Sequence, residues 1–399
     1  MKKIGFLFFS FTLVCFIASP FSFAQNLGPA EETKSRYLIS FHTSIDYELI
    51  KNLESKIIVE YQDMPVVAVE ISENNVSKLK DYPQIEFFEP DLKIKPVSEL
   101  KVPAESILLF KGLFLDQKKA SPQIVPWGIE KINALKVQEK GFTGKGIKIG
   151  IIDSGIDYTH DDLVVCGGTS FVEGNTDYMD DYGHGTAVAG IIGATNNHIG
   201  VAGIAPDSEL FSIKVLDSKG DGDISAVISG IEWAVKNKIN IINLSLETTT
   251  DSKTLKKAVK EAYKKGVLLV SAAGNNGFNK DDTIAFPAAY KEVIAVGAIN
   301  SRNERTFYSS SGKDLELMAP GASIYSTSLN NQYSMNLGTS MASAHVTGVA
   351  AQIWGAKPDL LKNKDIREIL DKTATKLGKK RTYGYGLVDA LKAFDYIWE

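Results

Sequence analysis

The stretch Asn336-Leu337-Gly338-Thr339-Ser340-Met341-Ala342-Ser343-Ala344-His345-Val346 decides how the rest of the chain is interpreted. After its glycine and its Thr-Ser pair, small and apolar residues continue to Trp354, which predicts a helix buried on most faces. A serine in the first turn of such a helix can point its hydroxyl into a cleft. The unpaired N–H groups of the helix start can face developing negative charge. An ordinary N-cap serine is the alternative interpretation.

Two further stretches carry the partners that such a serine needs. Lys148–Gly155 is an apolar run that reaches a carboxylate at Asp153, and Gly183–Gly190 opens a second small-residue helix with His184. In acyl transfer a serine attacks, a histidine takes its proton, and an aspartate orients the imidazole and stabilises its cation. The candidate catalytic residues are therefore Asp153, His184 and Ser340.

The chain order of these three residues resembles that of the subtilisin-type serine proteases. Each of the three stretches also resembles that family's motif around the same residue. The resemblance implies a secreted serine endopeptidase that is made as an autoprocessed pre-pro-enzyme and hydrolyses polypeptide substrates, and we expect a monomer. Two alternatives are a dedicated processing protease for one secreted peptide or leader, and a catalytically inactive binding module. The intact catalytic set argues against the second.

The N-terminus and the composition indicate where the protein acts and which partners are not expected. The chain has 399 residues, room for two or three domains, and its net charge of −4 gives no argument for nucleic acid as a partner. A basic start, an apolar run from Ile4 to Ala18 and Ser22-Phe23-Ala24 form the pattern of a signal peptide over residues 1–24. A membrane anchor is the alternative, but the run is short and no stop-transfer pattern follows, so we expect an extracellular protein without a stable anchor.

Cysteine usage leaves the mature chain without an internal crosslink. The sequence holds two cysteines, and Cys15 lies within the expected signal peptide. Cys166 would then stand alone, so we expect no intramolecular disulfide. A bound metal ion could supply the stabilisation that a disulfide would otherwise give.

A small α+β domain is expected over residues 25–97. Strands are predicted at Tyr37–Phe41, Pro65–Glu70 and Ile85–Asp91, with short helices at Ile45–Leu53 and Asn75–Lys80. This βαββαβ-like order resembles the inhibitory propeptide domain of subtilases, which implies that the chain's own propeptide acts as an intramolecular inhibitor covering the active site.

Residues 98–122 are expected to be a linker that contains the processing site. From about Leu92 to Gln123 the sequence is interpreted as a linker with a short helix or strand of unknown role. The dibasic pair Lys118-Lys119 predicts a mature protein that begins at or near Ala120.

The catalytic domain is expected to span residues 123–399. Predicted strands alternate with predicted helices, which indicates an α/β fold with a doubly wound parallel sheet. The strands are Ile147–Asp153, Glu209–Val215, Ile239–Leu246, Val267–Ala272 and Val293–Ala298, and the helices include Ser225–Lys238 and Lys253–Lys265. Asp153 then falls at the carboxyl end of a strand, where such sheets place ligand sites.

The resemblance also implies residues that stabilise the oxyanion and bind substrate. The asparagine after Ala-Ala-Gly maps to Asn275, whose amide would donate beside the backbone N–H of Ser340, although a simple turn is the alternative. Substrate should add as an extra strand between two edges. The expected substrate-binding residues are Gly220, Gly222, Ser245, Leu246, Glu247, Ala272, Gly274 and Ala285.

Glu247 stands where many relatives have glycine, so the wide pocket of those relatives is not expected here. Its carboxylate could pair with a basic side chain of the substrate residue before the cut, or it could point into solvent. The first alternative predicts a preference for Lys or Arg at that position.

A calcium site completes the expected features. Thr195-Asn196-Asn197-His198-Ile199-Gly200-Val201 resembles the calcium loop of bacterial subtilisins, with a polar hairpin as the alternative. Oxygen ligands of this kind suit Ca²⁺. The implied ligands are Gln123, Asp162, Thr195, Asn197, Ile199 and Val201.

Overall fold

A parallel sheet carries the larger part of the chain. The structure, a computed structural model, describes residues 33–97, 123–278 and 282–399. A 7-stranded sheet has the order β14-β13-β12-β10-β6-β8-β7, and all of its neighbouring pairs are parallel. Its strands are β6 (Lys148–Asp153), β7 (Val165–Ser170), β8 (Glu209–Lys214), β10 (Ile241–Leu244), β12 (Leu268–Ala272), β13 (Val293–Ile299) and β14 (Leu317–Pro320). The α/β fold expected from the sequence is confirmed.

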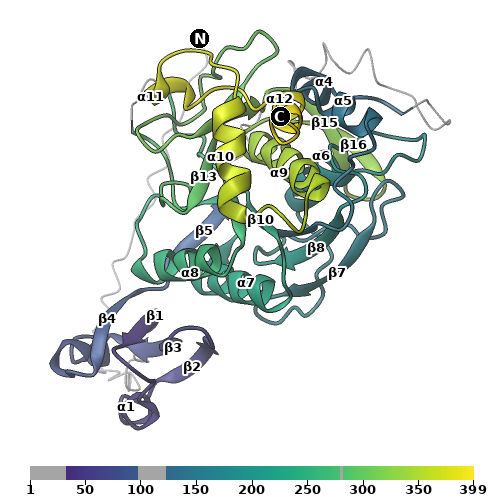
Figure 1. Ribbon diagram of the computed structural model, residues 1–399. Coiled ribbons are helices and arrows are strands. Elements are labelled where there is room, and N and C mark those ends of the chain that lie inside the picture. Colours follow the sequence, from purple (N-terminus) through teal and green to yellow (C-terminus); the bar gives the residue numbers. More distant parts are fainter. Residues whose placement is uncertain (1–32, 98–122, 279–281) are drawn as a thin grey trace, which may run out of the picture. The chain divides into compact units, whose positions relative to one another are not determined.

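Helices cover both faces of this sheet, which is why its strands are apolar on both sides (Figure 1). Ile149 and Ile151 of β6 belong to the core cluster that includes α6 and α9, whereas Ile152 belongs to the cluster that includes α7 and α8. The helices are α4 (Trp127–Lys131), α5 (Ala134–Glu139), α6 (His184–Gly193), α7 (Ile224–Lys236), α8 (Lys253–Lys264), α9 (Thr339–Ala356), α10 (Asn363–Thr373), α11 (Lys380–Tyr383) and α12 (Ala390–Tyr396).

Two strands of the sheet were not predicted. β7 contains the glycines of Val-Cys-Gly-Gly-Thr-Ser, which weaken a strand signal, and it forms one edge of the sheet. β14 is a four-residue strand that ends in proline at the other edge. Both exist because a neighbouring strand supplies their hydrogen bonds.

The N-terminal domain is a 4-stranded antiparallel sheet in the order β2-β3-β1-β4. Its elements are β1 (Lys34–Phe41), α1 (Tyr47–Asn52), β2 (Lys56–Glu60), β3 (Val66–Ser72), α2 (Glu73–Val76), η1 (Leu79–Asp81) and β4 (Ile85–Pro90). Residues Lys34–Glu399 form one compact unit. Ile39 packs in the small domain's own core, while its neighbour Leu38 joins the cluster that includes α7 and α8.

A 3-stranded antiparallel sheet connects the two parts in the order β11-β5-β9. Its strands are β5 (Lys93–Pro96), β9 (Gly222–Asp223) and β11 (Leu246–Glu247). The segment after Leu92, interpreted as a linker with a short helix or strand, therefore begins with a strand at residues 93–96, which two edges of the larger domain hold in place. A separate hairpin pairs β15 (Ile324–Ser328) with β16 (Gln332–Asn336).

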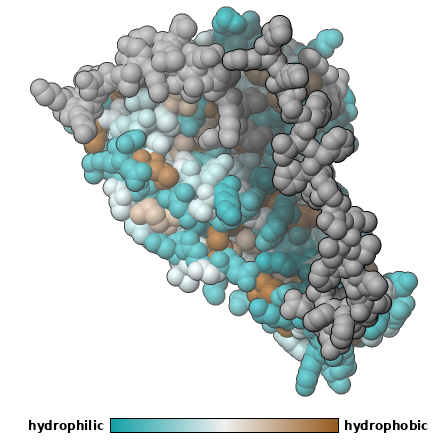
Figure 2. Space-filling model, turned by 180° about the vertical axis from the view of Figure 1, so that it is seen from behind, coloured by the Kyte–Doolittle hydropathy of each residue, from teal (hydrophilic) through white to brown (hydrophobic). Residues whose placement is uncertain are grey.

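The surface seen in Figure 2 is mainly hydrophilic where side chains are described, with apolar residues in small, separated areas. Within residues 33–97, 123–278 and 282–399, no helix is long and apolar enough to cross a membrane. The expected signal peptide and the dibasic pair Lys118-Lys119 lie outside the described residues.

Candidate active site

Asp153 and His184 meet in a buried contact. Asp153 is the last residue of β6 and His184 is the first residue of α6. Nδ1 of the imidazole lies 2.8 Å from Oδ1 and 2.9 Å from Oδ2 of the carboxylate, and both side chains are fully buried. A carboxylate only accepts hydrogen bonds, so Nδ1 carries the proton and Nε2 is the basic atom of the neutral ring.

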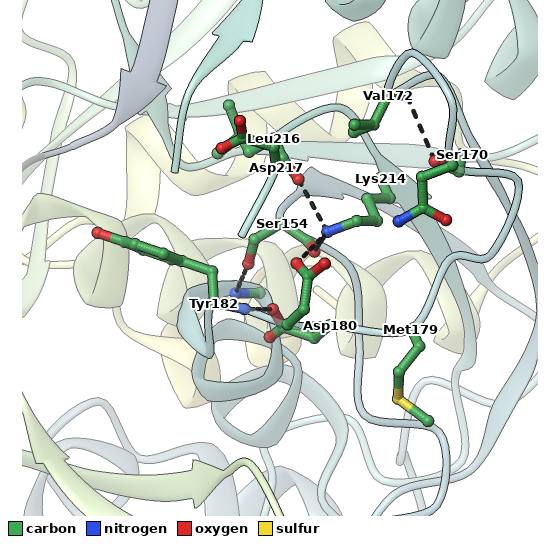
Figure 3. A network of polar contacts seen from close by, with 12 residues as sticks. Ser154, Ser170, Val172, Met179, Asp180, Tyr182, Lys214, Leu216 and Asp217 are labelled. Carbon is green, nitrogen blue, oxygen red and sulfur yellow. Dashed lines mark hydrogen bonds and ion pairs between the residues drawn. The ribbon is translucent and has the colours of Figure 1, made fainter. Parts of the chain in front are cut away.

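A fully buried lysine fixes the backbone just after Asp153 (Figure 3). Lys214 ends β8 directly beside Asp153 in the parallel register. Its Nζ donates to the carbonyl oxygen of Ser154 at 2.5 Å, to that of Leu216 at 2.8 Å and to Oδ1 of Asp181 at 2.6 Å. The sequence analysis did not single out Lys214, because a lysine at the end of a strand carries no signal of burial.

A second carboxylate fixes the start of α6. Asp180 Oδ1 accepts from the backbone N–H groups of Tyr182 and Gly183 at 3.0 and 2.8 Å (Figure 3). Asp180 Oδ2 accepts from the N–H and the hydroxyl of Thr186 at 2.9 and 2.6 Å. These bonds satisfy N–H groups that a helix start leaves unpaired, so they hold His184 at a defined angle.

Ser340 lies in the first turn of α9 and is buried. The N-cap of this helix is Gly338, so the interpretation of Ser340 as an N-cap residue is wrong. The Ser340 hydroxyl donates to the carbonyl oxygen of Ser245 at 3.4 Å, and α9 packs against α6, the helix that begins with His184. Ser245 follows β10, whose neighbour in the sheet is β6, so the sheet brings these segments to one edge.

Asn275 is oriented by the turn that precedes Ser340. Its Oδ1 accepts from the backbone N–H of Thr339 at 3.0 Å and from the Thr339 hydroxyl at 3.1 Å. Since Oδ1 is occupied by two donors, Nδ2 lies on the opposite side of the amide, next to Gly338. A Cβ at position 338 would stand 3.1 Å from Nδ2, and its backbone φ is +139°, so a glycine suits this position.

The strand β5 occupies the position expected for a substrate. Leu246 pairs with Pro96 and Glu247 with Lys95 on one side, and Gly222 pairs with Ile94 on the other. Beyond the strand, the N–H of Val97 donates to the carbonyl oxygen of Ser245 at 3.1 Å. That oxygen also accepts from the Ser340 hydroxyl, so Val97 lies beside the candidate nucleophile.

The glycines expected at the substrate edges are closely surrounded. A Cβ on Gly220 would lie 2.9 Å from the ring of Tyr182 and 3.3 Å from Pro96. A Cβ on Gly222 would lie 2.5 Å from the carbonyl oxygen of Val215. Tyr182, which the sequence analysis did not single out, therefore stands beside the strand that fills the cleft.

Residues expected to line the specificity pocket also meet. A Cβ on Gly274 would lie 2.7 Å from Glu247 Oε2 and 3.2 Å from the Ala285 methyl. Glu247 Oε2 also accepts from Asn276 Nδ2 at 3.2 Å. Ala272 is buried at the end of β12, which leads into this turn. The Glu247 carboxylate thus faces Gly274, and the residue is half-buried.

The candidate calcium ligands gather at one place. Gln123 Nε2 bridges the carbonyl oxygens of Thr195 and Val201 at 2.6 and 3.0 Å, and Asp162 Oδ2 accepts from the N–H of Val201 at 2.8 Å. Asn197 Oδ1 accepts from the N–H of Ile199 at 3.1 Å. Tyr333, which was not predicted, also donates to Asp162 Oδ2, at 3.2 Å.

These residues fit a calcium ion. Oδ1 of Asp162 is buried with no hydrogen-bond partner among the described residues, and burial raises the pKa of this carboxyl to about 6. The described residues contain no cluster of three or more His, Cys, Asp or Glu that could hold a metal. The expected site does not need one, since it combines a single carboxylate with amide and backbone oxygens, the donors that Ca²⁺ accepts.

Comparisons with known proteins show the family to which the chain belongs. The family model described as Subtilase family matches residues 144–386. Subtilisin DY of Bacillus licheniformis is 49% identical over 268 residues, 67% of this chain and 97% of that protein. Subtilisin E of Bacillus subtilis (strain 168) is 38% identical over 396 residues, 97% of each chain. Minor extracellular protease Epr of the same organism is 37% identical over 385 residues, 96% of this chain and 56% of that protein.

Proposed function

The chain belongs to the subtilase family and is a serine endopeptidase, and from that premise we propose that Ser340, His184 and Asp153 catalyse the hydrolysis of peptide bonds in its substrates. Ser340 Oγ attacks the scissile carbonyl carbon while His184 Nε2 takes its proton and then passes it to the leaving amine. Water, deprotonated by His184, then cleaves the acyl-serine ester, which releases the carboxylic acid and returns the proton to Ser340. Asp153 holds the ring and stabilises its cation. The observation that carries this proposal is the buried contact of His184 Nδ1 with both carboxylate oxygens of Asp153 at 2.8 and 2.9 Å.

The oxyanion of the tetrahedral intermediate is stabilised by the Asn275 amide and by the backbone N–H of Ser340. The orientation of Asn275, set by Thr339, supports this role because it leaves Nδ2 on the side away from its two donors. Such donors act in a buried site, where they are worth more than in water.

Substitution of the triad tests the mechanism. Ser340→Ala and Asp153→Asn should each lower kcat on a peptide substrate by at least about 10⁴-fold, while binding of a peptide inhibitor persists. A matched control, Ser301→Ala on an exposed turn, should keep full activity. Activity that survives in Ser340→Ala would contradict the assignment, and a wild-type protein that binds peptides without cleaving them would favour the binding-module alternative.

We also propose that the domain of residues 25–97 is an inhibitory propeptide. Its β5 strand fills the cleft, and two carboxylates at the end of β4 cap helices of the larger domain. Glu89 accepts from the N–H groups of Lys253 and Thr254 at the start of α8, at 3.0 and 2.9 Å. Asp91 accepts from the N–H and the hydroxyl of Ser225 in the first turn of α7, at 2.9 and 2.6 Å. Negative charge at a helix N-terminus is stabilising.

The first self-cleavage is proposed between Val97 and Ser98. The supporting observation is the shared acceptor, since Val97 N–H and Ser340 Oγ both reach the carbonyl oxygen of Ser245. The dibasic pair Lys118-Lys119 then serves for a later cut that leaves Ala120 near the mature N-terminus and retains Gln123. N-terminal sequencing of products during maturation should find Ser98 before Ala120. A first new N-terminus at any other residue would contradict this order.

Secretion and a bound Ca²⁺ complete the proposal. Secretion is supported by the signal-peptide pattern of residues 1–24 and by the relative named as an extracellular protease. Calcium is supported by the buried carboxylate oxygen of Asp162 and by the nearby carbonyl groups of Thr195 and Val201. The Gln123 amide, whose Nε2 contacts those carbonyl groups here, would bind the ion through its oxygen. When bound, the ion would join the loop of residues 195–201 to Gln123 and Asp162. These three parts of the site are far apart in the sequence.

A further inference from the structure

Two lysines of the strand that fills the cleft form ion pairs with the cleft edge. Lys93 Nζ lies 2.7 Å from Asp223 Oδ1, and Lys95 Nζ lies 3.1 Å from Asp221 Oδ1. Alternate residues of a strand share one face, so both lysines lie on the same face of β5. The residue between them, Ile94, is fully buried on the opposite face.

The acidic side chains on that face come from both neighbouring strands. Asp223 is opposite Lys93 in the β5–β9 register, and Glu247 is opposite Lys95 in the β5–β11 register. Residues that are paired across strands point their side chains to the same face. Asp221 and Asp223 form the ion pairs with these lysines, whereas the Glu247 carboxylate faces Gly274, so we call Asp221 and Asp223 the acidic wall of the cleft.

The cations that neutralise this wall come from the part of the chain that maturation removes. Within the described residues, the ion-pair partners of Asp221 and Asp223 are Lys95, Lys93 and Arg36, all of which precede residue 98. After the proposed cut, the two carboxylates keep no ion-pair partner from residues 123–278 or 282–399. A polypeptide that then enters the cleft meets an acidic wall that its own side chains can neutralise.

The opposite face of the cleft has different chemistry. Ile94 belongs to the same buried cluster as Leu216, Ile224 and Leu246. In a substrate strand bound in this position, every second residue therefore lies next to carboxylates. The residue between them lies next to apolar side chains.

We propose that the mature enzyme selects polypeptides with basic residues at the third and fifth positions before the cut. This inference rests on the proposed function, because it counts positions back from Val97 as the residue before the cut. Lys95, Ile94 and Lys93 then occupy the third, fourth and fifth positions. The substrate class is a cationic segment with alternating lysines, of which the propeptide's own strand is the first example.

The expected selectivity is moderate. The two lysine side chains are 67–68% exposed, whereas those of Asp221 and Asp223 are 43% and 16% exposed. Pairs of this kind are worth about two- to fivefold in an equilibrium constant, with the partly buried Asp223 at the upper end, so two lysines should give about tenfold. Since exposed ion pairs are screened by salt, the ratio of kcat/KM for substrates with and without the lysines should fall toward one in 1 M NaCl.

Internally quenched peptides test the proposal with the mature enzyme. The peptides share isoleucine at the fourth position, proline at the second and valine before the cut. They carry Lys or Gln at the third and fifth positions. We expect kcat/KM for the Lys/Lys peptide to exceed that for the Gln/Gln peptide by about tenfold at low salt, and each single Lys peptide to lie between them.

Variants identify the residues responsible. The double variant Asp221→Asn, Asp223→Asn should bring the ratio close to one, because asparagine keeps the size of aspartate but not its charge. The control Glu368→Gln, at an exposed position of α10, removes one charge far along the chain and should keep the wild-type ratio.

The outcomes separate this proposal from the proposed function. A wild-type ratio near one at low salt, or a tenfold ratio that persists in the double variant, overturns the selectivity while cleavage itself still supports a protease. A protein that cleaves none of the peptides contradicts the proposed function and this inference together. Cleavage that disappears in Ser340→Ala shows that the measured rates belong to this enzyme.

Discussion

Replacing Lys214 with methionine should destabilise the protein through the backbone that follows Asp153. The ammonium group is fully buried and donates to the carbonyl oxygens of Ser154 and Leu216 (Figure 3). It also donates to the Asp181 carboxylate. Methionine has a similar length and fills the same space, so the change removes the three donated hydrogen bonds without leaving a large cavity.

The magnitude follows from the acceptors that lose their donor. Each buried carbonyl oxygen left unsatisfied costs about 1–3 kcal/mol, whereas the Asp181 side chain is 41% exposed and can be hydrated. Relief of the buried charge offsets part of this loss. We expect the free energy of unfolding to fall by about 2–4 kcal/mol.

Guanidinium unfolding, followed by tryptophan fluorescence, measures this change in a Ser340→Ala precursor that cannot digest itself. Lys236→Met, at an exposed position in the last turn of α7, is the matched control and should change the stability by less than about 0.5 kcal/mol. In the otherwise wild-type enzyme, Lys214→Met should also lower kcat more than it raises KM, since Ser154 directly follows Asp153. A stability of Lys214→Met equal to that of the control would refute the reasoning.

Four further predictions address the oxyanion donor, a buried histidine, the metal and the pocket. Asn275→Ala should lower kcat by about 10²–10³-fold with little change in KM, and a loss below tenfold in steady-state kinetics would count against its role as a donor. Burial lowers the pKa of His345 to about 4, below the 6.5 of an unfolded histidine. Because the unfolded chain then binds the proton first, the free energy of unfolding is unaffected by this group above pH 6.5 and falls by about 3 kcal/mol as the pH drops to 4. His345→Gln should remove that part of the pH dependence in unfolding titrations, and an unchanged slope would reject it. Chelation should lower the Tm of the mature enzyme and Asn197→Ala should remove most of this sensitivity, whereas identical melting with and without chelator would exclude the calcium site. Glu247→Gln should reduce kcat/KM by up to about fivefold for peptides with Lys before the cut while sparing those with Leu; a wild-type enzyme that already prefers Leu by a wide margin would contradict this.

The sequence predicted those parts of the fold that depend on local patterns. Asp153 does end a strand, His184 does begin a helix, and the helix that contains Ser340 is buried on most faces. These features are set by runs of apolar or small residues with a glycine or polar residue at one end, so they are visible without knowledge of distant contacts.

The features that were missed depend on contacts between distant segments. β5 has only four residues and two of them are lysines, and it becomes a strand because β9 and β11 supply hydrogen bonds on both sides. Lys214 is buried because three acceptors from separate segments converge on its ammonium group, which no pattern around Lys214 reveals. Tyr333 reaches Asp162 across 171 positions of the chain.

Covalent labelling with a fluorophosphonate probe tests the central claim most directly. The account predicts a single adduct on the Ser340 hydroxyl of the mature protein, located by mass spectrometry of the labelled peptide. Labelling should be absent in Ser340→Ala and strongly slowed in His184→Ala, because the nucleophile then lacks its base. An adduct on another serine, or no labelling of a protein that still cleaves peptides, would contradict the account.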